Sequence, residues 1–160
     1  MKQLFSLFIF TLVLFSQSGF AALSEAPVIN LPGISGKVQL ETLKGKVVYL
    51  DFWASWCKPC QKSFPWMHDI KKSYADQGFE VVAVNLDKDR SLADDFLKEV
   101  DVNFMVAFDE SGKSAAQYKL RGMPSSYLIG RDGKVYASHV GFREKDKKQL
   151  EQAIKSLLNK

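Results

Sequence analysis

A nearly continuous apolar run at residues 47–52 is followed, five residues later, by the first of two cysteines. A helical pattern begins at that cysteine. The run, Val-Val-Tyr-Leu-Asp-Phe, is typical of a buried central strand. The cysteines lie in Cys57-Lys58-Pro59-Cys60, and apolar residues then recur at helical spacing to about residue 77. This order places two sulfur atoms between a buried strand and the N-terminus of a helix, which indicates an α/β fold.

Strands and helices alternate along the rest of the chain. Further strands are expected at residues 37–40, as an edge strand, and at 80–85, 104–108, 126–129 and 135–140. Further helices are expected at residues 91–99, 113–118 and 145–158. A leader loop containing Pro27 and Pro32 comes first, Ser91 is expected to cap its helix, and Asp132-Gly133 favours a hairpin between the last two strands. The alternation predicts one sheet with helices on both faces.

The N-terminus has the pattern of a secretory signal peptide. Lys2 precedes an apolar stretch at residues 4–15, and Gly19 and Ala21 form the best −3/−1 pair, so cleavage is expected after Ala21. The chain then divides into a signal peptide, 1–21, and one domain, 22–160. Because a spanning helix needs about 20 apolar residues, an uncleaved membrane anchor is the less favoured alternative.

Composition and cysteine usage narrow the function. Hydrophobic residues make up 46% and charged residues 25% of the chain, which is typical of a globular protein and excludes a disordered one. The net charge of +4 comes with acidic residues among the basic ones, which gives no case for nucleic-acid binding. The chain has two cysteines, and a bridge between them would close too short a loop to constrain the unfolded chain strongly. The spacing therefore favours redox chemistry over structural stabilisation.

Three segments carry a resemblance to a known family. Residues 51–60, Asp-Phe-Trp-Ala-Ser-Trp-Cys-Lys-Pro-Cys, closely resemble the active-site stretch of thioredoxins. Residues 118–125, Tyr-Lys-Leu-Arg-Gly-Met-Pro-Ser, resemble the thioredoxin segment whose proline is cis and faces the active-site sulfurs. Gly141 falls where the family has a glycine in its last strand, and Pro65 falls where it has a helix kink. The resemblance extends from about residue 46 to the end of the chain.

Within that superfamily the chain is most similar to the exported TlpA/ResA-type branch. The signal peptide, the Gly-Lys-Val-Val-Tyr-Leu sequence at 45–50 and the long insert between Asn85 and Tyr118 carry this resemblance. It implies a thioredoxin fold: a central mixed β-sheet flanked by helices on both faces, with a TlpA-type central insertion and an N-terminal β-extension. It also implies a periplasmic thiol–disulfide oxidoreductase that reduces protein disulfides, with apocytochrome c among the candidate substrates. A membrane thiol–disulfide donor of the DsbD/CcdA type would re-reduce it, and no cofactor beyond its own cysteines is expected.

The chemistry of exchange assigns roles to the Cys57-Lys58-Pro59-Cys60 motif. A thiolate is the attacking species, and a helix N-terminus stabilises one at Cys57, so Cys57 is expected to attack and Cys60 to resolve the mixed disulfide. Pro59 suits the first helical turn, where its missing N–H costs nothing. Lys58 either lowers the pKa of Cys57 further or points into solvent, where screening leaves little effect.

Asp51 is the second candidate for chemistry. It lies within an apolar strand, where burying a carboxylate costs free energy unless the group has a catalytic role or is paired with an opposite charge. By resemblance it is the buried acid that takes the proton from the resolving cysteine. The lysine that thioredoxins place opposite this acid is replaced by Ala83, so the pKa of Asp51 should be raised. The alternative is a partly solvated aspartate at a sheet edge.

The resemblance also predicts a substrate surface. Pro124 is expected to be cis, which leaves the Met123 backbone free to bind an extended substrate segment as an added strand. Trp56 is expected to line the same surface, whereas Trp53 is expected in the core. Several ResA-like proteins carry a glutamate three residues after the second cysteine, and Ser63 stands there instead, which weakens a transfer to cytochrome-specific reduction. A small contact surface favours a monomer.

Other functions remain as alternatives. A disulfide-donating oxidase would use the same cysteines, but such oxidants commonly carry a larger helical insertion. A non-catalytic copper(I)-handling protein would use Cys57, Cys60 and Met123 as soft ligands. A metal site that added His68 and His139 matches no familiar zinc spacing, so no metal is expected.

Overall fold

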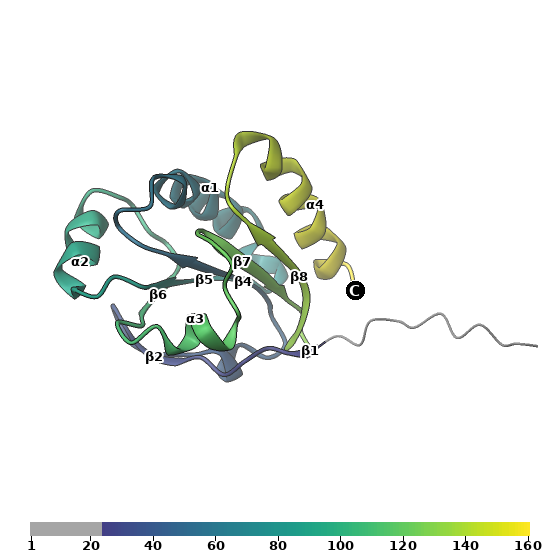
Figure 1. The fold of residues 1–160 in the computed structure, drawn as a ribbon. Coiled ribbons are helices and arrows are strands. Elements are labelled where there is room, and N and C mark those ends of the chain that lie inside the picture. Colours follow the sequence, from purple (N-terminus) through teal and green to yellow (C-terminus); the bar gives the residue numbers. More distant parts are fainter. Residues whose placement is uncertain (1–23) are drawn as a thin grey trace, which may run out of the picture.

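The computed structural model describes residues 24–160, and the expected signal peptide lies outside them. One eight-stranded sheet, in the order β1-β8-β7-β4-β5-β6-β2-β3, runs through the described part (Figure 1). Strands β4, β5 and β6 pair in parallel and the other neighbours pair antiparallel. The strands are β1 Ser24–Glu25, β2 Asn30–Gly33, β3 Gly36–Gln39, β4 Val47–Trp53, β5 Phe79–Asn85, β6 Met105–Phe108, β7 Ser125–Ile129 and β8 Lys134–Val140.

Helices cover both faces of this sheet, as the sequence predicts. Helices α1, Lys58–Tyr74, and α4, Lys147–Leu158, lie on one face, and α3, Lys113–Gln117, lies on the other (Figure 1). Helix α2, Arg90–Lys98, follows β5 and packs its Phe96 ring against Trp53 and Phe64. Short 3-10 helices occupy Leu40–Leu43, Ala75–Gln77 and Glu144–Asp146. The predicted thioredoxin-like α/β architecture is therefore confirmed.

Strand β4 lies in the middle of the sheet and separates two hydrophobic cores. Every residue of β4 and β5 is buried. Because side chains alternate along a strand, Tyr49 and Trp53 join the core beneath α1 and α4, whereas Leu50 and Phe52 join the core on the opposite face. Asp51 follows the same alternation, so its side chain lies on the α1 and α4 face.

The structure differs from the sequence prediction in the leader segment and at the start of α2. The expected leader loop contains strand β2, in which Pro32 is paired with Lys37 of β3. β2 pairs with β6 through Gly33 alone, so Pro32 has no β6 partner to which a backbone N–H would have to donate. A proline is therefore tolerated at this position. Helix α2 is capped by Asp89 rather than Ser91, since the Asp89 carboxylate accepts from the Ser91 N–H at 2.9 Å.

Two other local predictions are confirmed. The hairpin of β7 and β8 forms around Asp132-Gly133, and β3 is an edge strand. The β2–β3 hairpin lies on the β6 side of the sheet, and the segment between β5 and β7 contains α2, β6 and α3. That these segments are the TlpA-type N-terminal extension and central insertion stays a prediction. Among residues 24–160, no helix combines the length and apolar character needed to cross a membrane.

Candidate active site

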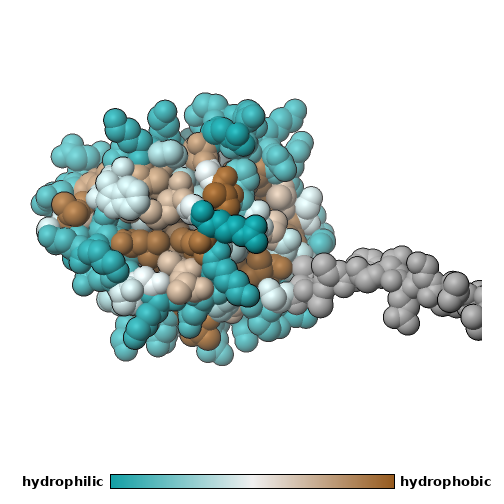
Figure 2. Space-filling model, viewed as in Figure 1, coloured by the Kyte–Doolittle hydropathy of each residue, from teal (hydrophilic) through white to brown (hydrophobic). Residues whose placement is uncertain are grey.

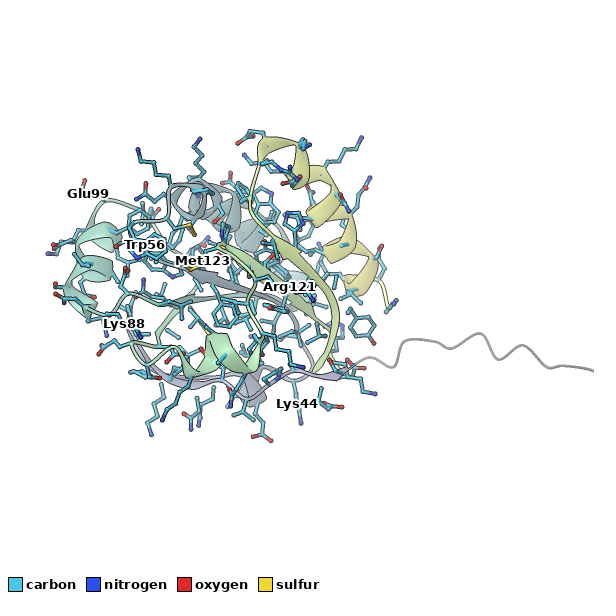
Figure 3. The ribbon with its side chains drawn as sticks, viewed as in Figure 1. Lys44, Trp56, Lys88, Glu99, Arg121 and Met123 are labelled. Atoms are coloured by element: carbon cyan, nitrogen blue, oxygen red, sulfur yellow. A yellow bond between two sulfur atoms is a disulfide. The ribbon has the colours of Figure 1, made fainter. Side chains whose placement is uncertain are left out.

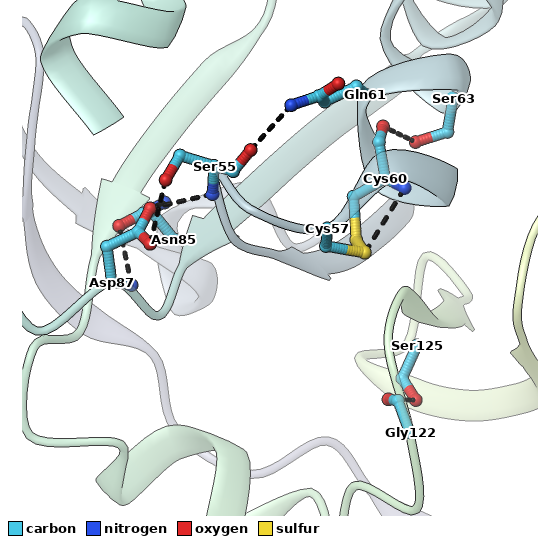
Figure 4. Close-up of a disulfide and its surroundings, with 9 residues drawn as sticks. All are labelled: Ser55, Cys57, Cys60, Gln61, Ser63, Asn85, Asp87, Gly122 and Ser125. Atoms are coloured by element: carbon cyan, nitrogen blue, oxygen red, sulfur yellow. Dashed lines mark hydrogen bonds between the residues drawn. A yellow bond between two sulfur atoms is a disulfide. The ribbon is translucent and has the colours of Figure 1, made fainter. Parts of the chain in front are cut away.

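The two cysteines form a disulfide at the N-terminus of α1, just beyond the end of β4 (Figure 4). Their Cα atoms are 5.2 Å apart. Cys57 is the N-cap residue, and its Sγ accepts a hydrogen bond of 3.3 Å from the Cys60 N–H. Cys57 is 5% exposed and Cys60 is fully buried. The sulfur of Cys57 is thus the one nearer to solvent, and it faces the positive end of the α1 dipole.

The two residues between the cysteines point outward. Pro59 lies in the first turn of α1, as predicted, where a proline costs no hydrogen bond. Lys58 is exposed, and within the described chain it takes part in no ion pair. This favours the alternative in which Lys58 projects into solvent and has little effect on Cys57.

A buried network that the sequence analysis missed holds the loop between β4 and α1. The Asp87 carboxylate accepts from the Ser55 N–H at 2.8 Å, the Ser55 hydroxyl at 3.0 Å and the Asn85 amide at 2.7 Å (Figure 4). Gln61 of α1 donates to the Ser55 carbonyl at 2.6 Å. Parallel β4 and β5 end side by side, so polar residues just after β5 could have pointed to this contact.

Replacing Asp87 with alanine should loosen this loop. The Ser55 N–H and the Asn85 amide would lose their acceptor while buried or half-buried, so we expect a loss of about 2–4 kcal/mol in the free energy of unfolding. Urea unfolding of the oxidised protein measures this. Asp95→Ala, which removes an exposed carboxylate of α2 paired with Lys98, is the control and should change stability by less than about 1 kcal/mol. Equal stability of the two variants would contradict the role of Asp87.

Asp51 is buried at the centre of the sheet. It is 1% exposed, and its Oδ2 has no hydrogen-bond partner within the described chain. Its neighbour on β5 is Ala83, as the sequence resemblance predicted. Burial raises the pKa of the Asp51 carboxyl well above its ordinary value. The alternative of a solvated aspartate at a sheet edge is therefore wrong, because β4 is flanked by β5 and β7.

The segment before β7 faces the disulfide (Figure 4). The Met123–Pro124 peptide bond is cis. The Pro124 carbonyl accepts from the Gly141 N–H at 2.8 Å, and the Ser125 hydroxyl donates to the Gly122 carbonyl at 2.7 Å. Met123 is half-buried and packs against the core cluster that contains both cysteines. The Pro124 side chain is buried, so it supports this surface from below rather than lining it.

The comparisons with known proteins agree with this geometry. The Redoxin family matches residues 21–154. The chain belongs to the Redoxin family. It is 37% identical over 134 residues to a thiol-disulfide oxidoreductase ResA of Bacillus cereus. The matched region covers 83% of this chain and 76% of that protein. It is 40% identical over 113 residues to ResA of Bacillus subtilis (strain 168), which covers 70% of this chain and 63% of that protein.

Solved structures of the superfamily have the same fold. A Chlorobium tepidum protein, provisionally assigned as thiol:disulfide interchange protein DsbE, is 51% identical, with a TM-score of 0.84 over 85% of this chain and 96% of that one. The pneumococcal exposed lipoprotein thioredoxin Etrx1 of Streptococcus pneumoniae is 34% identical, with a TM-score of 0.72 over 81% and 99% of the chains. This Redoxin-family chain is therefore a ResA/TlpA-type thiol–disulfide oxidoreductase, an enzyme acting on protein thiols and disulfides.

This Redoxin-family protein exposes apolar side chains in the segments next to its active site. Trp56 is 67% exposed and Val140, at the end of β8, is 51% exposed. Trp56 directly precedes Cys57 in the chain, and Figure 3 shows Trp56 and Met123 near each other in the middle of one face. Apolar side chains gather in the middle of this face between hydrophilic rims (Figure 2). Trp53, by contrast, is fully buried against Phe64, which confirms its expected place in the core.

The remaining candidates lie apart from one another. Ser63 is buried, and its hydroxyl donates to the Cys60 carbonyl at 2.7 Å, so it bonds back to the helix backbone at the resolving cysteine. His68 contacts the Asp101 carbonyl, whereas His139 lies on β8 with its Nε2 3.5 Å from Asp146 Oδ2. In the described part of the chain, no three histidine, cysteine or carboxylate side chains are grouped as metal ligands would be.

Proposed function

We propose that this enzyme is exported and that it reduces disulfides of extracytoplasmic proteins through the Cys57–Cys60 pair. The observation that carries the reducing direction is the sparse stabilisation of the attacking sulfur. Within residues 24–160, the hydrogen bond to Cys57 Sγ comes from one backbone N–H, and the neighbouring Lys58 is exposed. A strong oxidant is one whose reduced form is stabilised, and little is built here to do so.

The reaction follows from the order of exposure of the two sulfurs. The Cys57 thiolate attacks one sulfur of the substrate disulfide, and the other substrate sulfur leaves as a thiolate that takes up a proton. The Cys60 thiol then loses its proton, and its sulfur attacks Cys57 Sγ. The second substrate thiolate departs, so two electrons have passed to the substrate and the enzyme holds its own disulfide. Cys57, as the more exposed sulfur, suits the first step.

Asp51 supplies the base for the second step in this proposal. Its Oδ2 is buried without a hydrogen-bond partner among the described residues, so taking up a proton relieves the desolvation of the carboxylate. Pro59 holds the first turn of α1 in a helical conformation. Lys58 has no assigned role beyond the motif, because it is exposed.

The substrate would lie across the apolar surface formed by Trp56, Met123 and Val140. The Met123 N–H and carbonyl are available to pair with an extended segment of the substrate as an added strand, and Pro124 supports that backbone from below. A contact of this size favours transient binding and a monomeric enzyme. Apocytochrome c remains a candidate substrate, although Ser63 in place of a glutamate weakens that choice.

Export is supported by the signal-peptide pattern at residues 1–21 and by the description of the pneumococcal relative as an exposed lipoprotein. An exported reductase must be re-reduced from the cytoplasmic side, because the periplasm is kept oxidising. We therefore propose a membrane thiol–disulfide donor of the DsbD/CcdA type as its partner.

The reduction potential of the Cys57–Cys60 pair tests the direction. We expect a value near that of thioredoxin, about −270 mV, after equilibration with defined dithiothreitol ratios. Lys58→Ala should move it by less than about 30 mV, the equivalent of a tenfold change in equilibrium constant. A value near that of DsbA, about −120 mV, would make the enzyme a disulfide donor instead. Copper(I) binding without any insulin reduction would favour the metal-handling alternative.

A further inference from the structure

A row of polar side chains crosses the sheet from the buried acid toward the surface. Asp51 of β4 is paired with Ser126 of β7, and Ser126 is paired with His139 of β8. Residues directly opposite each other on neighbouring strands point to the same face, so all three side chains lie beneath α1 and α4. Two strand spacings separate Asp51 from His139, about 10 Å.

The two ends of this row carry unpartnered polar atoms. In the described chain, Asp51 Oδ2 and His139 Nε2 are both buried without a hydrogen bond. The distance of 3.5 Å from His139 Nε2 to Asp146 Oδ2 permits charge attraction but is too long for a good hydrogen bond. Buried polar groups are nearly always satisfied, so each of these atoms requires a partner such as water.

A cavity of about 90 Å³ lies between the sheet and α4, and Ser126 and His139 line it, whereas Asp51 lies beside it on β4. Tyr49, Ser126 and His139 contribute polar groups to its wall, together with Gln149 of α4. Ser126 lies directly opposite Asp51 on the neighbouring strand, and Tyr49 lines the same cavity as Ser126. The cavity is large and polar enough to hold several water molecules.

The other sides of Asp51 offer no comparable route within the described chain. Its neighbour on β5 is Ala83, which carries no group that could pass a proton. The hydrophobic core on its face of the sheet includes the apolar α1 residues Trp66, Met67 and Ile70. A carboxyl that takes a proton in each turnover must also release it, and the polar row is the connection present on this face.

We propose that Ser126 and His139, with water in the cavity beneath α4, form the route by which the Asp51 carboxyl exchanges its proton with solvent. The inference rests on the proposed role of Asp51 as base. Asp51 takes the proton of the Cys60 thiol, and the route passes one proton onward through the Ser126 hydroxyl and the His139 imidazole to bulk water. The Asp51 carboxylate is thereby restored, and no electrons move in these steps.

The charged groups at the outer end suit this task. Asp146 is hydrogen-bonded by Arg143 through Nε at 2.9 Å, which holds the pKa of Asp146 below its usual range. The Asp146 carboxylate lies 3.5 Å from His139 Nε2, so its negative charge faces the outer end of the row. Tyr49, Asp51, Asp146 and, through Asp146, Arg143 are the titratable groups facing the row. The residues of α4 that line the cavity are uncharged.

Repeated turnover tests the route, because Asp51 must release the proton of one resolution before it can act as base in the next. Insulin reduction with dithiothreitol as electron source would be followed across pH, and its rate compared with that of a single resolution after rapid mixing with a chromogenic aromatic disulfide. We expect His139→Ala and Ser126→Val to slow repeated turnover about tenfold and to leave the single resolution unchanged. The reduction potential should stay within about 30 mV of wild type, the equivalent of a tenfold change in equilibrium constant, because a route changes a rate and not an end state. Added imidazole should restore the rate of His139→Ala, since that variant leaves space for it.

Two comparison variants separate this inference from the proposed function. His68→Gln changes the other histidine, which lies on α1, and should turn over at the wild-type rate. Asp51→Asn reports on the base itself. Slow resolution in Asp51→Asn together with wild-type turnover in His139→Ala and Ser126→Val would overturn the route alone. A wild-type resolution rate in Asp51→Asn would overturn both the base and its route. A slow His139→Ala that imidazole does not rescue, with a shifted potential, would mark a structural role and also overturn the route.

Discussion

Cys57→Ser is expected to abolish disulfide exchange, whereas Cys60→Ser should accumulate a stable mixed disulfide with substrate. Cys57 provides the more exposed sulfur at the N-terminus of α1, so its loss removes the attacking thiolate itself. We expect insulin reduction by Cys57→Ser to fall to background, a loss of at least about a thousandfold. In Cys60→Ser the first attack proceeds, but the buried resolving sulfur is missing.

Mass spectrometry of Cys60→Ser after incubation with a disulfide-containing peptide measures the trapped species. The double variant lacking both sulfurs is the matched control and should trap nothing. Far-UV circular dichroism checks that each variant is folded, because a short-loop disulfide contributes only about 2 kcal/mol to stability. Trapping by Cys57→Ser in place of Cys60→Ser would reverse the roles of the two cysteines.

Asp51→Asn is expected to slow resolution and to stabilise the fold at neutral and alkaline pH. Removing a base that acts in the second step should cost about 10²-fold in its rate. The stability effect follows from burial, which raises the pKa of Asp51 in the folded state. A carboxyl with a raised folded-state pKa favours folding fully below its unfolded value of about 3.9, and this contribution is lost as the pH rises through the folded-state pKa.

Urea unfolding of the oxidised wild type and Asp51→Asn over a series of pH values measures that contribution. The wild type should lose stability relative to Asp51→Asn as the pH rises, and the difference should stay constant once the folded-state carboxyl is ionised. Two curves that run parallel across the whole range would show that the carboxyl is not desolvated in the folded protein. Because the rate and stability readouts are separate, a slow variant that is also more stable cannot owe its slowness to unfolding.

Local patterns in the sequence were sufficient to predict much of the fold and the role of the two cysteines. The apolar run of β4, the helical spacing of α1 and the Asp132-Gly133 hairpin depend on interactions within a few residues, and the structure contains all three. The burial of Asp51 was also predictable, since its neighbours along the strand are apolar on both sides. The cap of α2 was predicted wrongly by two residues, because Asp89 and Ser91 both carry good capping side chains.

The tertiary structure decided which distant residues serve the site. Asp87 binds Ser55 because β4 and β5 run in parallel and end together, although 32 residues separate the two. Ser126 and His139 reach the neighbourhood of Asp51 through strand order and register, which no local pattern specifies, because a shift of one residue would turn every side chain to the other face. The sequence by itself determined the two cysteines and a carboxyl within a buried strand. The pairing of strands far apart in the chain placed Ser126 and His139 in one row with that carboxyl.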